Sequence, residues 1–171
     1  MSESEPSRIR TFTWQDPHPT AAAGLTLSGF DYLSAMSRGE IPSPPLAATL
    51  GFDHFPAEVA RGVVTFFFEP QEYHYNPIGS VHGGVISTLL DSASGCAVHS
   101  MLSAAAGYTS LELKVNFIRA VYAKTGIMHC TGTLISLGRR TAVAEAKLFD
   151  AADKLYAHCT QTCLIFAPGE R

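Results

Sequence analysis

The sequence contains little charge and no run of basic residues. Only 16% of its 171 residues are Asp, Glu, Lys or Arg, and the formal net charge at pH 7 is −3. Domains that bind nucleic acid usually carry a basic patch or stripe, so we expect no nucleic-acid partner. Hydrophobic residues make up 46% of the chain, which is enough for a substantial core in a single domain.

The sequence also lacks a recognisable export or membrane segment. Residues 1–10 are polar and include acidic side chains, unlike a secretory or transit peptide. The longest apolar stretch, 85–102, is interrupted by Asp91 and His99, whereas a membrane span needs about 20 largely uncharged residues. We therefore expect a cytoplasmic protein with no membrane partner.

Pairs of cysteine or histidine with the spacing of metal ligands are missing. Without an export signal, the cysteines are expected to be reduced core residues. The seven histidines are scattered, so we expect no metal site and no other cofactor. The four cysteines are Cys96, Cys130, Cys159 and Cys163.

The stretch 85–102 predicts a long buried helix. Large residues recur at spacings of three and four, as in Ile86, Leu89 and Leu90, which favours a helix of about 27 Å. The segment has almost no polar face, so we expect it to be buried on all sides within a sheet. The small residues that would let strands approach closely are Ser94, Gly95 and Ala97.

Two features of this helix are unusual. Asp91 lies in its apolar part, and an unpaired buried carboxylate is costly, so it has either a structural partner or a place in a working cavity. Gly83 and Gly84 lie where the helix begins, beside free backbone N–H groups and the positive end of the helix dipole. The glycines suit either an approaching ligand oxygen or simply a tight entry to the helix.

The pattern Asn-Pro-x-Gly-x-x-His-Gly-Gly over 76–84, followed after six residues by Asp91, resembles hotdog-fold acyl-CoA thioesterases. In particular, it is similar to the family of the phenylacetate-degradation thioesterase. The segments 109–119 and 137–140 look like the strand after the helix and a later hairpin of that family. The resemblance covers about residues 46–167.

The remaining pattern predicts an α+β protein. The segment 111–117 alternates strictly between apolar and polar residues, and the joins between the later strands are short, which favours an antiparallel meander. The expected architecture is a long central helix wrapped by a curled antiparallel sheet of five to six strands, which the hotdog resemblance also implies. The expected strands are 59–69, buried on both faces, then 111–117, 125–135, 142–150 and 155–166.

Two regions are expected along the chain. Residues 1–45 form an N-terminal extension with a mobile or loosely docked arm (1–23), a short helix (25–38) and a Pro-rich linker. Residues 46–171 form the hotdog thioesterase domain.

The resemblance implies hydrolysis of acyl-CoA thioesters to the free acid and coenzyme A. Asp91 would act as general base or nucleophile, and the Gly83 N–H would polarise the thioester carbonyl. Asn76 would orient the carbonyl or the water. A hydroxyl on the strand after the helix would assist, and the strand match favours Ser110 over Thr109, which lies on the other face by parity.

His82 has two possible roles. It can act as a base near neutral pH, or it can hold the motif turn by a hydrogen bond. A base at this position would fit a hotdog hydratase or dehydratase acting on acyl-CoA or acyl-carrier-protein substrates. A non-catalytic acyl-CoA-binding module is a further alternative.

The resemblance also implies contacts with coenzyme A from two segments, although paired arginines in a hairpin equally suit a solvated surface. The implied substrate-binding residues are Gly84, Phe117, Ile118, Arg119, Ala120, Ser136, Leu137, Gly138, Arg139, Arg140 and Thr141.

The same resemblance implies a homodimer, often assembled into a tetramer, in which the glycine and the acid of one site come from different subunits. The helix geometry agrees, because His82 and Asp91 would lie about 13 Å apart along one helix. The acyl group is not determined. Aromatic residues near the expected mouth permit an aryl group but also suit core packing, and these are Phe66, Phe68, Tyr73 and Tyr75.

Overall fold

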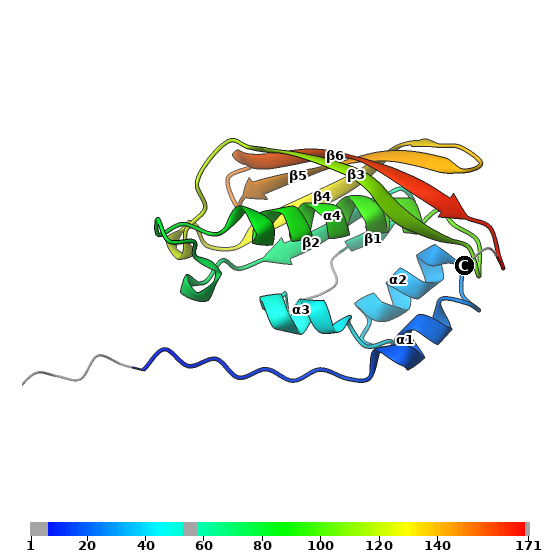
Figure 1. Cartoon of the computed structure of the whole chain (residues 1–171), viewed down its shortest axis with the longest axis horizontal. Helices are drawn as coiled ribbons and strands as arrows, with labels where there is room; N and C mark the ends of the chain where they lie inside the picture. Colours follow the sequence, from blue (N-terminus) through cyan, green and yellow to red (C-terminus); the bar gives the residue numbers. More distant parts are fainter. Residues whose placement is uncertain (1–6, 53–57, 170–171) are drawn as a thin grey trace, which may run out of the picture.

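The computed structural model describes residues 7–52 and 58–169. In this part of the chain a curled antiparallel sheet wraps around the long helix α4, and the N-terminal helices lie on the side of α4 away from the sheet (Figure 1). The elements are α1 Pro17–Ala23, α2 Gly29–Ser37, α3 Pro45–Leu50, β1 Glu58–Ala60, β2 Val63–Phe68, η1 Glu72–His74, α4 Gly83–His99, β3 Gly107–Phe117, η2 Ala123–Thr125, β4 Met128–Leu137, β5 Thr141–Asp150 and β6 Leu155–Phe166.

The sheet of the described residues has six strands in the order β1-β2-β4-β5-β6-β3. The prediction of a meander is correct for β4, β5 and β6 but wrong for β3, which pairs with β6 at the edge of the sheet. The connection from β3 to β4 therefore crosses from this edge back to the middle of the sheet. As a result, β3 pairs with a strand on one side only, and its other side is an open edge.

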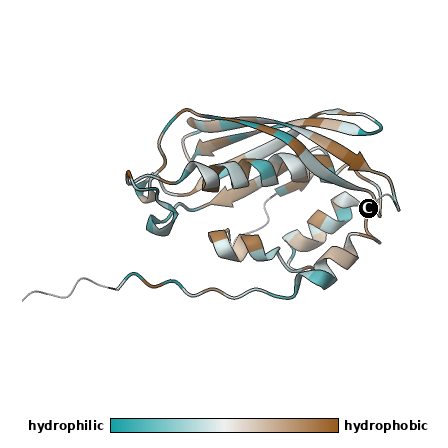
Figure 2. Ribbon diagram, in the orientation of Figure 1, coloured by the Kyte–Doolittle hydropathy of each residue, from teal (hydrophilic) through white to brown (hydrophobic). Residues whose placement is uncertain are grey.

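The apolar face of α4 forms the centre of the core. Leu89, Leu90 and Ala93 are fully buried and pack with Phe66 and Phe68 of β2. Figure 2 shows α4 as mostly apolar or neutral along its length. In a single chain, however, the helix is not buried on all sides as predicted, because the side facing away from the sheet, including Thr88 and Ser92, is half-exposed.

The strand expected over 59–69 is a hairpin instead. The chain turns at Arg61 and Gly62, where Gly62 has φ +78°, so that β1 pairs with β2. The expectation that both faces are buried is also wrong, because Phe67 on the outer face is 42% exposed while Phe66 and Phe68 are buried. Aromatic residues on both faces hid this alternation.

The N-terminal extension contains one more helix than the sequence suggested. Part of the expected arm forms α1, whose N-cap Asp16 accepts a hydrogen bond from the His18 N–H. Helix α2 docks at the end of α4, where the Gly29 N–H donates to the carbonyl of Leu102 at 3.0 Å. Residues 1–6 of the arm lie outside the described residues, and no helix of the described part is long and apolar enough to cross a membrane.

The sheet approaches the backbone of α4 closely at Gly132 of β4. A Cβ at this position would lie 2.0 Å from the carbonyl oxygen of Ala93 and 2.7 Å from the backbone nitrogen of Ser94. Side-chain movement cannot relieve a clash with helix backbone. The glycine in the strand, together with small residues on the helix, therefore sets the spacing of the two layers.

We predict that Gly132→Ala lowers the free energy of unfolding by about 1–3 kcal/mol through overpacking. Chemical denaturation measures the change. Gly24→Ala is the matched control, because Gly24 has φ −66° and its added Cβ would meet ordinary contacts. This control is expected to change stability by less than about 1 kcal/mol, and equal effects of the two substitutions would contradict the role given to Gly132.

Candidate active site

The turn before α4 is held by its own asparagine. The Asn76 side-chain oxygen accepts hydrogen bonds from the backbone N–H groups of Ile78 and Ser80 at 3.0 and 3.2 Å, and its Nδ2 donates to Ser80 Oγ at 3.1 Å. Gly79 supplies the left-handed conformation that the turn requires, with φ +81°. Asn76 therefore fixes the approach to the helix.

His82 is the N-cap of α4. Its Nδ1 accepts a hydrogen bond from the Gly84 N–H at 2.8 Å. A neutral imidazole that accepts at Nδ1 carries its proton on Nε2, which then donates rather than accepts. The geometry thus supports the structural role of His82 and disfavours a role as base.

Gly83 lies beside an open cavity at the start of α4. No described residue accepts a hydrogen bond from the Gly83 N–H. This N–H lies at the positive end of the dipole of the 17-residue helix α4. It lines a cavity of about 290 Å³ together with Asn76 and the segment 117–120. A Cβ on Gly83 would lie 3.0 Å from the ring of Phe117, so a side chain here would crowd the cavity wall.

Asp91 lies about two helical turns further along α4, in contact with two strands. Its Oδ1 accepts hydrogen bonds from Ser110 Oγ at 2.9 Å and from Nε2 of Gln161, and Gln161 Nε2 also donates to Ser110 Oγ at 2.8 Å. No described residue donates to Oδ2. The carboxylate is therefore oriented through one oxygen, while the other is available for chemistry.

Ser110 reaches Asp91 because of a β-bulge. In the pairing of β3 with β6, Ser110 lies opposite Cys163 and Glu112 lies opposite Thr162, which leaves Leu111 as an extra residue. Strict alternation from Leu113 and Val115 would have turned Ser110 outward. The extra residue reverses the parity, so Ser110 shares the inner face with Leu113.

Gln161 is the residue of this group that the sequence analysis missed. Its side chain is only 1% exposed, and its Oε1 is buried without a hydrogen-bond partner among the described residues. A signal was present, because Gln161 is the one polar side chain among the inward positions of β6. The others are Ala157, Cys159, Cys163 and Ile165.

The thiols near Asp91 are poor nucleophiles. Burial, with a smaller contribution from the negative charge of Asp91, raises the pKa of Cys96 to about 12 and that of Cys163 to about 11. Both thiols stay protonated near neutral pH, and a thiolate is needed for attack. Among these neighbours, the carboxylate is the group suited to act as base or nucleophile.

The two predicted substrate-binding segments lie near opposite ends of helix α4. Phe117, Ile118, Arg119 and Ala120 line the cavity at Gly83, and the Arg119 guanidinium donates to the Leu155 carbonyl. The predicted segment 136–141 forms the β4–β5 hairpin at the other end of α4 (Figure 1). It is exposed throughout.

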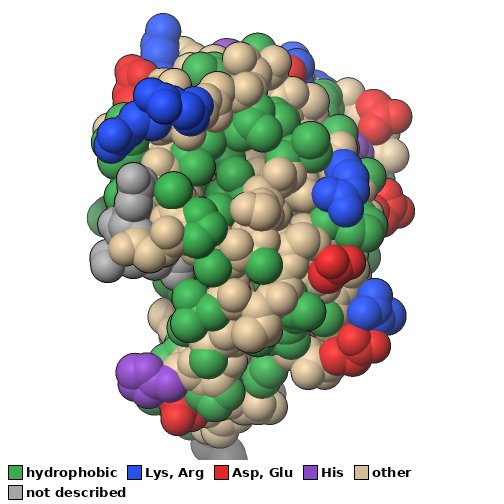
Figure 3. Space-filling view, turned by 90° about the vertical axis from the view of Figure 1, so that its right-hand side faces the viewer, with side chains coloured by type: hydrophobic (Ala, Val, Ile, Leu, Met, Phe, Trp, Pro, Cys, Tyr) green, Lys and Arg blue, Asp and Glu red, His purple; other side chains and the backbone are tan. Residues whose placement is uncertain are grey.

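The hairpin arginines are available to a ligand. No described residue forms an ion pair or hydrogen bond with the guanidinium of Arg139 or Arg140. Figure 3 views the molecule from this end, where hydrophobic side chains cover much of the middle and charged side chains gather toward the rim. The structure does not bring the hairpin to the Gly83 cavity within one chain.

The two chemical groups of the site are likewise separate within one chain. Gly83 and Asp91 are eight residues apart on α4, which corresponds to about 12 Å along the helix axis. A single carbonyl carbon cannot contact both groups across this distance.

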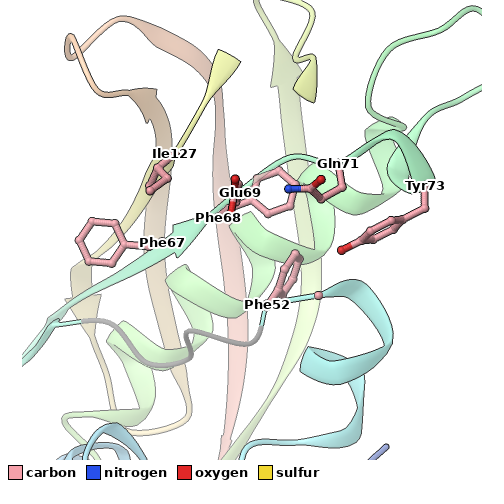
Figure 4. A pocket seen from close by; sticks show the side chains of 8 residues that line it. Phe52, Phe67, Phe68, Glu69, Gln71, Tyr73 and Ile127 are labelled. Atoms are coloured by element: carbon pink, nitrogen blue, oxygen red, sulfur yellow. The ribbon is translucent and has the colours of Figure 1, made fainter. Parts of the chain in front are cut away.

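A larger cavity lies away from these groups. It measures about 540 Å³ and is lined by Phe52, Phe67, Tyr73 and Ile127 among others (Figure 4). None of the predicted catalytic or substrate-binding residues lines it, but Phe68 and Tyr73, two of the aromatic residues expected near the mouth, do. Phe66 is a core residue. No cluster of metal-ligating side chains occurs among the described residues.

Comparison with known proteins gives consistent matches. A family model described as the thioesterase superfamily matches residues 78–157. A solved structure of a phenylacetic acid degradation-related protein from Ralstonia eutropha is 30% identical, with a TM-score of 0.69, and the match covers 78% of this chain and 98% of that one.

Two curated proteins are also similar. A 1,4-dihydroxy-2-naphthoyl-CoA hydrolase from Listeria monocytogenes is 28% identical over 74% of this chain and 98% of its own length. An esterase from Halobacterium salinarum is 32% identical over 50% of this chain, and the match spans 56% of that protein. These matches confirm the predicted α+β hotdog fold, and the chain belongs to the thioesterase superfamily.

Proposed function

We propose that this protein hydrolyses acyl-CoA thioesters, with Asp91 as the general base or nucleophile. The observation that carries the proposal is the carboxylate of Asp91, which is anchored at Oδ1 by Ser110 and Gln161 and has Oδ2 available. The similarity to a hydrolase of an aryl-CoA supports coenzyme A as the leaving group.

In the general-base route, Asp91 Oδ2 removes a proton from water as the water oxygen attacks the thioester carbon. The C–S bond then breaks, and the coenzyme A thiolate takes up the proton. In the nucleophilic route, Oδ2 itself attacks, the C–S bond breaks and the coenzyme A thiolate leaves. Water then cleaves the resulting anhydride to the free acid and the Asp91 carboxylate, and the released proton goes to the thiolate. Either route places negative charge on the carbonyl oxygen, where a preorganised N–H donor is typically worth about 3 kcal/mol.

The donor for that oxygen is the Gly83 N–H of a second copy of the chain. The open edge of β3 supports such a homodimer, because exposed strand edges are usually paired or protected. Leu111, Phe117 and Ile118 on or next to this edge are 59%, 55% and 45% exposed. Two antiparallel α4 helices would bring each Gly83 to the Asp91 of the other chain.

This pairing would also bring together the two predicted coenzyme A-binding segments, 117–120 and 136–141, which are far apart in one chain. The hairpin with Arg139 and Arg140 lies near the C-terminal end of α4, and the cavity with Arg119 lies near its N-terminal end. Antiparallel chains or a further pair of chains would bring such segments together. The guanidiniums would then bind the phosphates of coenzyme A.

We predict that Asp91→Asn lowers kcat for acyl-CoA hydrolysis by at least about 100-fold, the usual contribution of a positioned base. Release of coenzyme A from a panel of acyl-CoAs measures the effect. Asp153→Asn is the control, because Asp153 is an exposed turn residue with φ +58°, a conformation that Asn tolerates. Hydrolysis that persists in Asp91→Asn would exclude this role. Binding without turnover by the wild type would favour the non-catalytic module.

We predict that Gln161→Met separates activity from stability. Loss of the donor to Asp91 should lower kcat about tenfold or more, since hydrogen bonds to charged groups contribute about 1.5–3 kcal/mol, while KM changes little. Removal of Oε1, which has no hydrogen-bond partner among the described residues, should offset the loss of that bond, so the thermal midpoint should change little. A lower midpoint with unchanged kcat would instead indicate a purely structural role for Gln161.

A mixing experiment tests whether the site spans two chains. Asp91→Asn and Gly83→Val are each expected to be inactive, yet refolding them together should restore about a quarter of wild-type activity, because half of the dimers are mixed and each has one intact site. A mixture of Gly83→Val with the double variant Gly83→Val/Asp91→Asn should restore no activity, because neither chain supplies an intact Gly83. No recovery in the first mixture, with dimers present, would place Gly83 and Asp91 in separate functions.

A further inference from the structure

The segment that leads into the turn 76–82 contains one buried residue, His74. It is 4% exposed, although its neighbours in the short helix η1, Glu72 and Tyr73, are exposed. Its ring lies beside that of Phe68 of β2, with centroids 5.2 Å apart. Buried polar groups are almost always hydrogen-bonded, so the partners of His74 indicate what its burial achieves.

Both ring nitrogens of His74 lie at hydrogen-bond distance from the backbone. Nδ1 accepts a hydrogen bond from the Gln71 N–H at 2.9 Å, and Nε2 lies 2.6 Å from the carbonyl oxygen of Leu50, the last residue of α3. Because a backbone N–H can only donate, Nδ1 carries no proton, and the proton on Nε2 is donated to Leu50. The contacts therefore require the neutral imidazole. A second proton, on Nδ1, would face the Gln71 N–H and set two donors against each other.

The backbone of His74 contacts the start of α4. Its carbonyl oxygen accepts a hydrogen bond from the N–H of His82 at 2.8 Å. His82 is the N-cap of α4, and Gly83 follows it directly. At the other end of the turn, Asn76 comes two residues after His74. A displacement of His74 would therefore move both ends of the turn.

Helix α3, to which the His74 ring is bonded, is itself held by the N-terminal arm. The Arg10 guanidinium donates hydrogen bonds to the carbonyls of Ala48 and Thr49 in the last turn of α3. Cationic side chains are favourable at helix C-termini. The same guanidinium lies 4.3 Å from the ring centroid of Tyr73. The arm, α3, His74 and the turn before α4 thus form one connected series of contacts.

The surroundings of His74 favour its neutral form. Burial lowers the pKa of His74, and the positive charge of Arg10 acts in the same direction, although the hydrogen bond to the carbonyl of α3 opposes both. Neither α3 nor β2 contains a titratable side chain. The titratable groups on the remaining elements in contact are Tyr73, Glu72, which pairs with Arg8, and the N-cap His82.

We propose that His74 is a positioning residue that, in its neutral form, holds the turn 76–82 against α3 and thereby fixes the Gly83 N–H for the thioester carbonyl. The inference rests on the proposed function, since that function gives Asn76 and Gly83 their roles. It also connects the N-terminal part of the chain to the reaction rate. The arm and α3 lie outside residues 78–157, which the thioesterase family model matches.

Two variants of the full-length chain test the role of His74 in hydrolysis. His74→Gln keeps a donor for the Leu50 carbonyl, whereas His74→Phe keeps a ring but forms neither hydrogen bond. We expect His74→Phe to lower kcat at least about tenfold with little change in KM, since a misplacement of about 1 Å can cost about 100-fold. His74→Gln should recover most of the wild-type kcat. The control is His129→Gln on the outer face of β4, which should leave kcat unchanged.

Hydrogen exchange and thermal unfolding test the same contacts without hydrolysis. Near neutral pH, backbone amides in the peptide 75–84 should exchange faster in His74→Phe than in wild type or His74→Gln, because the bond to α3 is lost. A His pKa that is lowered in the folded state makes stability fall as the pH drops below about 6.5. The thermal midpoint of wild type should therefore fall relative to that of His74→Gln in this range. Parallel midpoints would overturn the requirement for a neutral His74.

The outcomes separate this inference from the proposed hydrolysis. Unchanged kcat in folded His74→Phe would overturn the positioning role, whether or not exchange is faster, and would leave the role of Asp91 intact. If wild type shows no turnover, yet His74→Phe loosens the peptide 75–84 and His74→Gln restores it, the coupling stands and the proposed hydrolysis fails. If His74→Phe does not fold, His74→Asn decides, because it keeps an acceptor for the Gln71 N–H but is too short for Leu50. Unchanged kcat in His74→Asn would then overturn the inference.

Discussion

The carboxylate of Asp91 on an otherwise apolar helix is the constraint on which the rest of the site depends. A half-buried carboxylate needs hydrogen-bond donors, and the nearby hydroxyls of Thr88 and Ser94 on α4 donate to carbonyls of the helix itself. The donors come from β3 and β6, through Ser110 and Gln161. Both strands must therefore lie over this part of the helix, and the bulge at Leu111 must turn the hydroxyl inward.

Satisfying this carboxylate has a structural cost. Gln161 turns its Nε2 toward the negative charge, because an amide oxygen in that place would repel it. Its own Oε1 is then buried with no hydrogen-bond partner in the described part of the chain, which typically costs about 1–3 kcal/mol. Such a compromise is common where a group is positioned for chemistry rather than for stability. It explains why a polar side chain occupies an inward position of β6.

The groups of the candidate site are spread along α4, so one chain does not bring them together. The N–H of Gly83 lies at one end, and α2 docks at the other, with Asp91 between them. The half-exposed outer side of α4 and the open edge of β3 are adjacent features of the same chain. A second copy that covers both would complete the site and remove the exposed edge.

The sequence alone predicted the individual helix, strand and turn of this region, because each has a pattern set by residues close together in the chain. The apolar spacing of 86–97 identified the helix, the alternation of 111–117 identified a strand, and Asn76 to Gly84 identified a turn leading into a helix N-terminus. Asp91 stood out because a carboxylate is rare in such a segment. These signals depend only on neighbours within a few residues, where backbone geometry dictates the pattern.

Only the tertiary structure decided which strands are neighbours and which side chains meet. The position of β3 beside β6, the hairpin at Gly62 and the partnership of Asp91 with Gln161, 70 residues away, leave no local periodic signal. The bulge even opposes the simple alternation, so strict periodicity would have turned Ser110 to the wrong face. Pairing between distant strands depends on how the sheet packs around α4, which includes the close contact of Gly132 with Ala93.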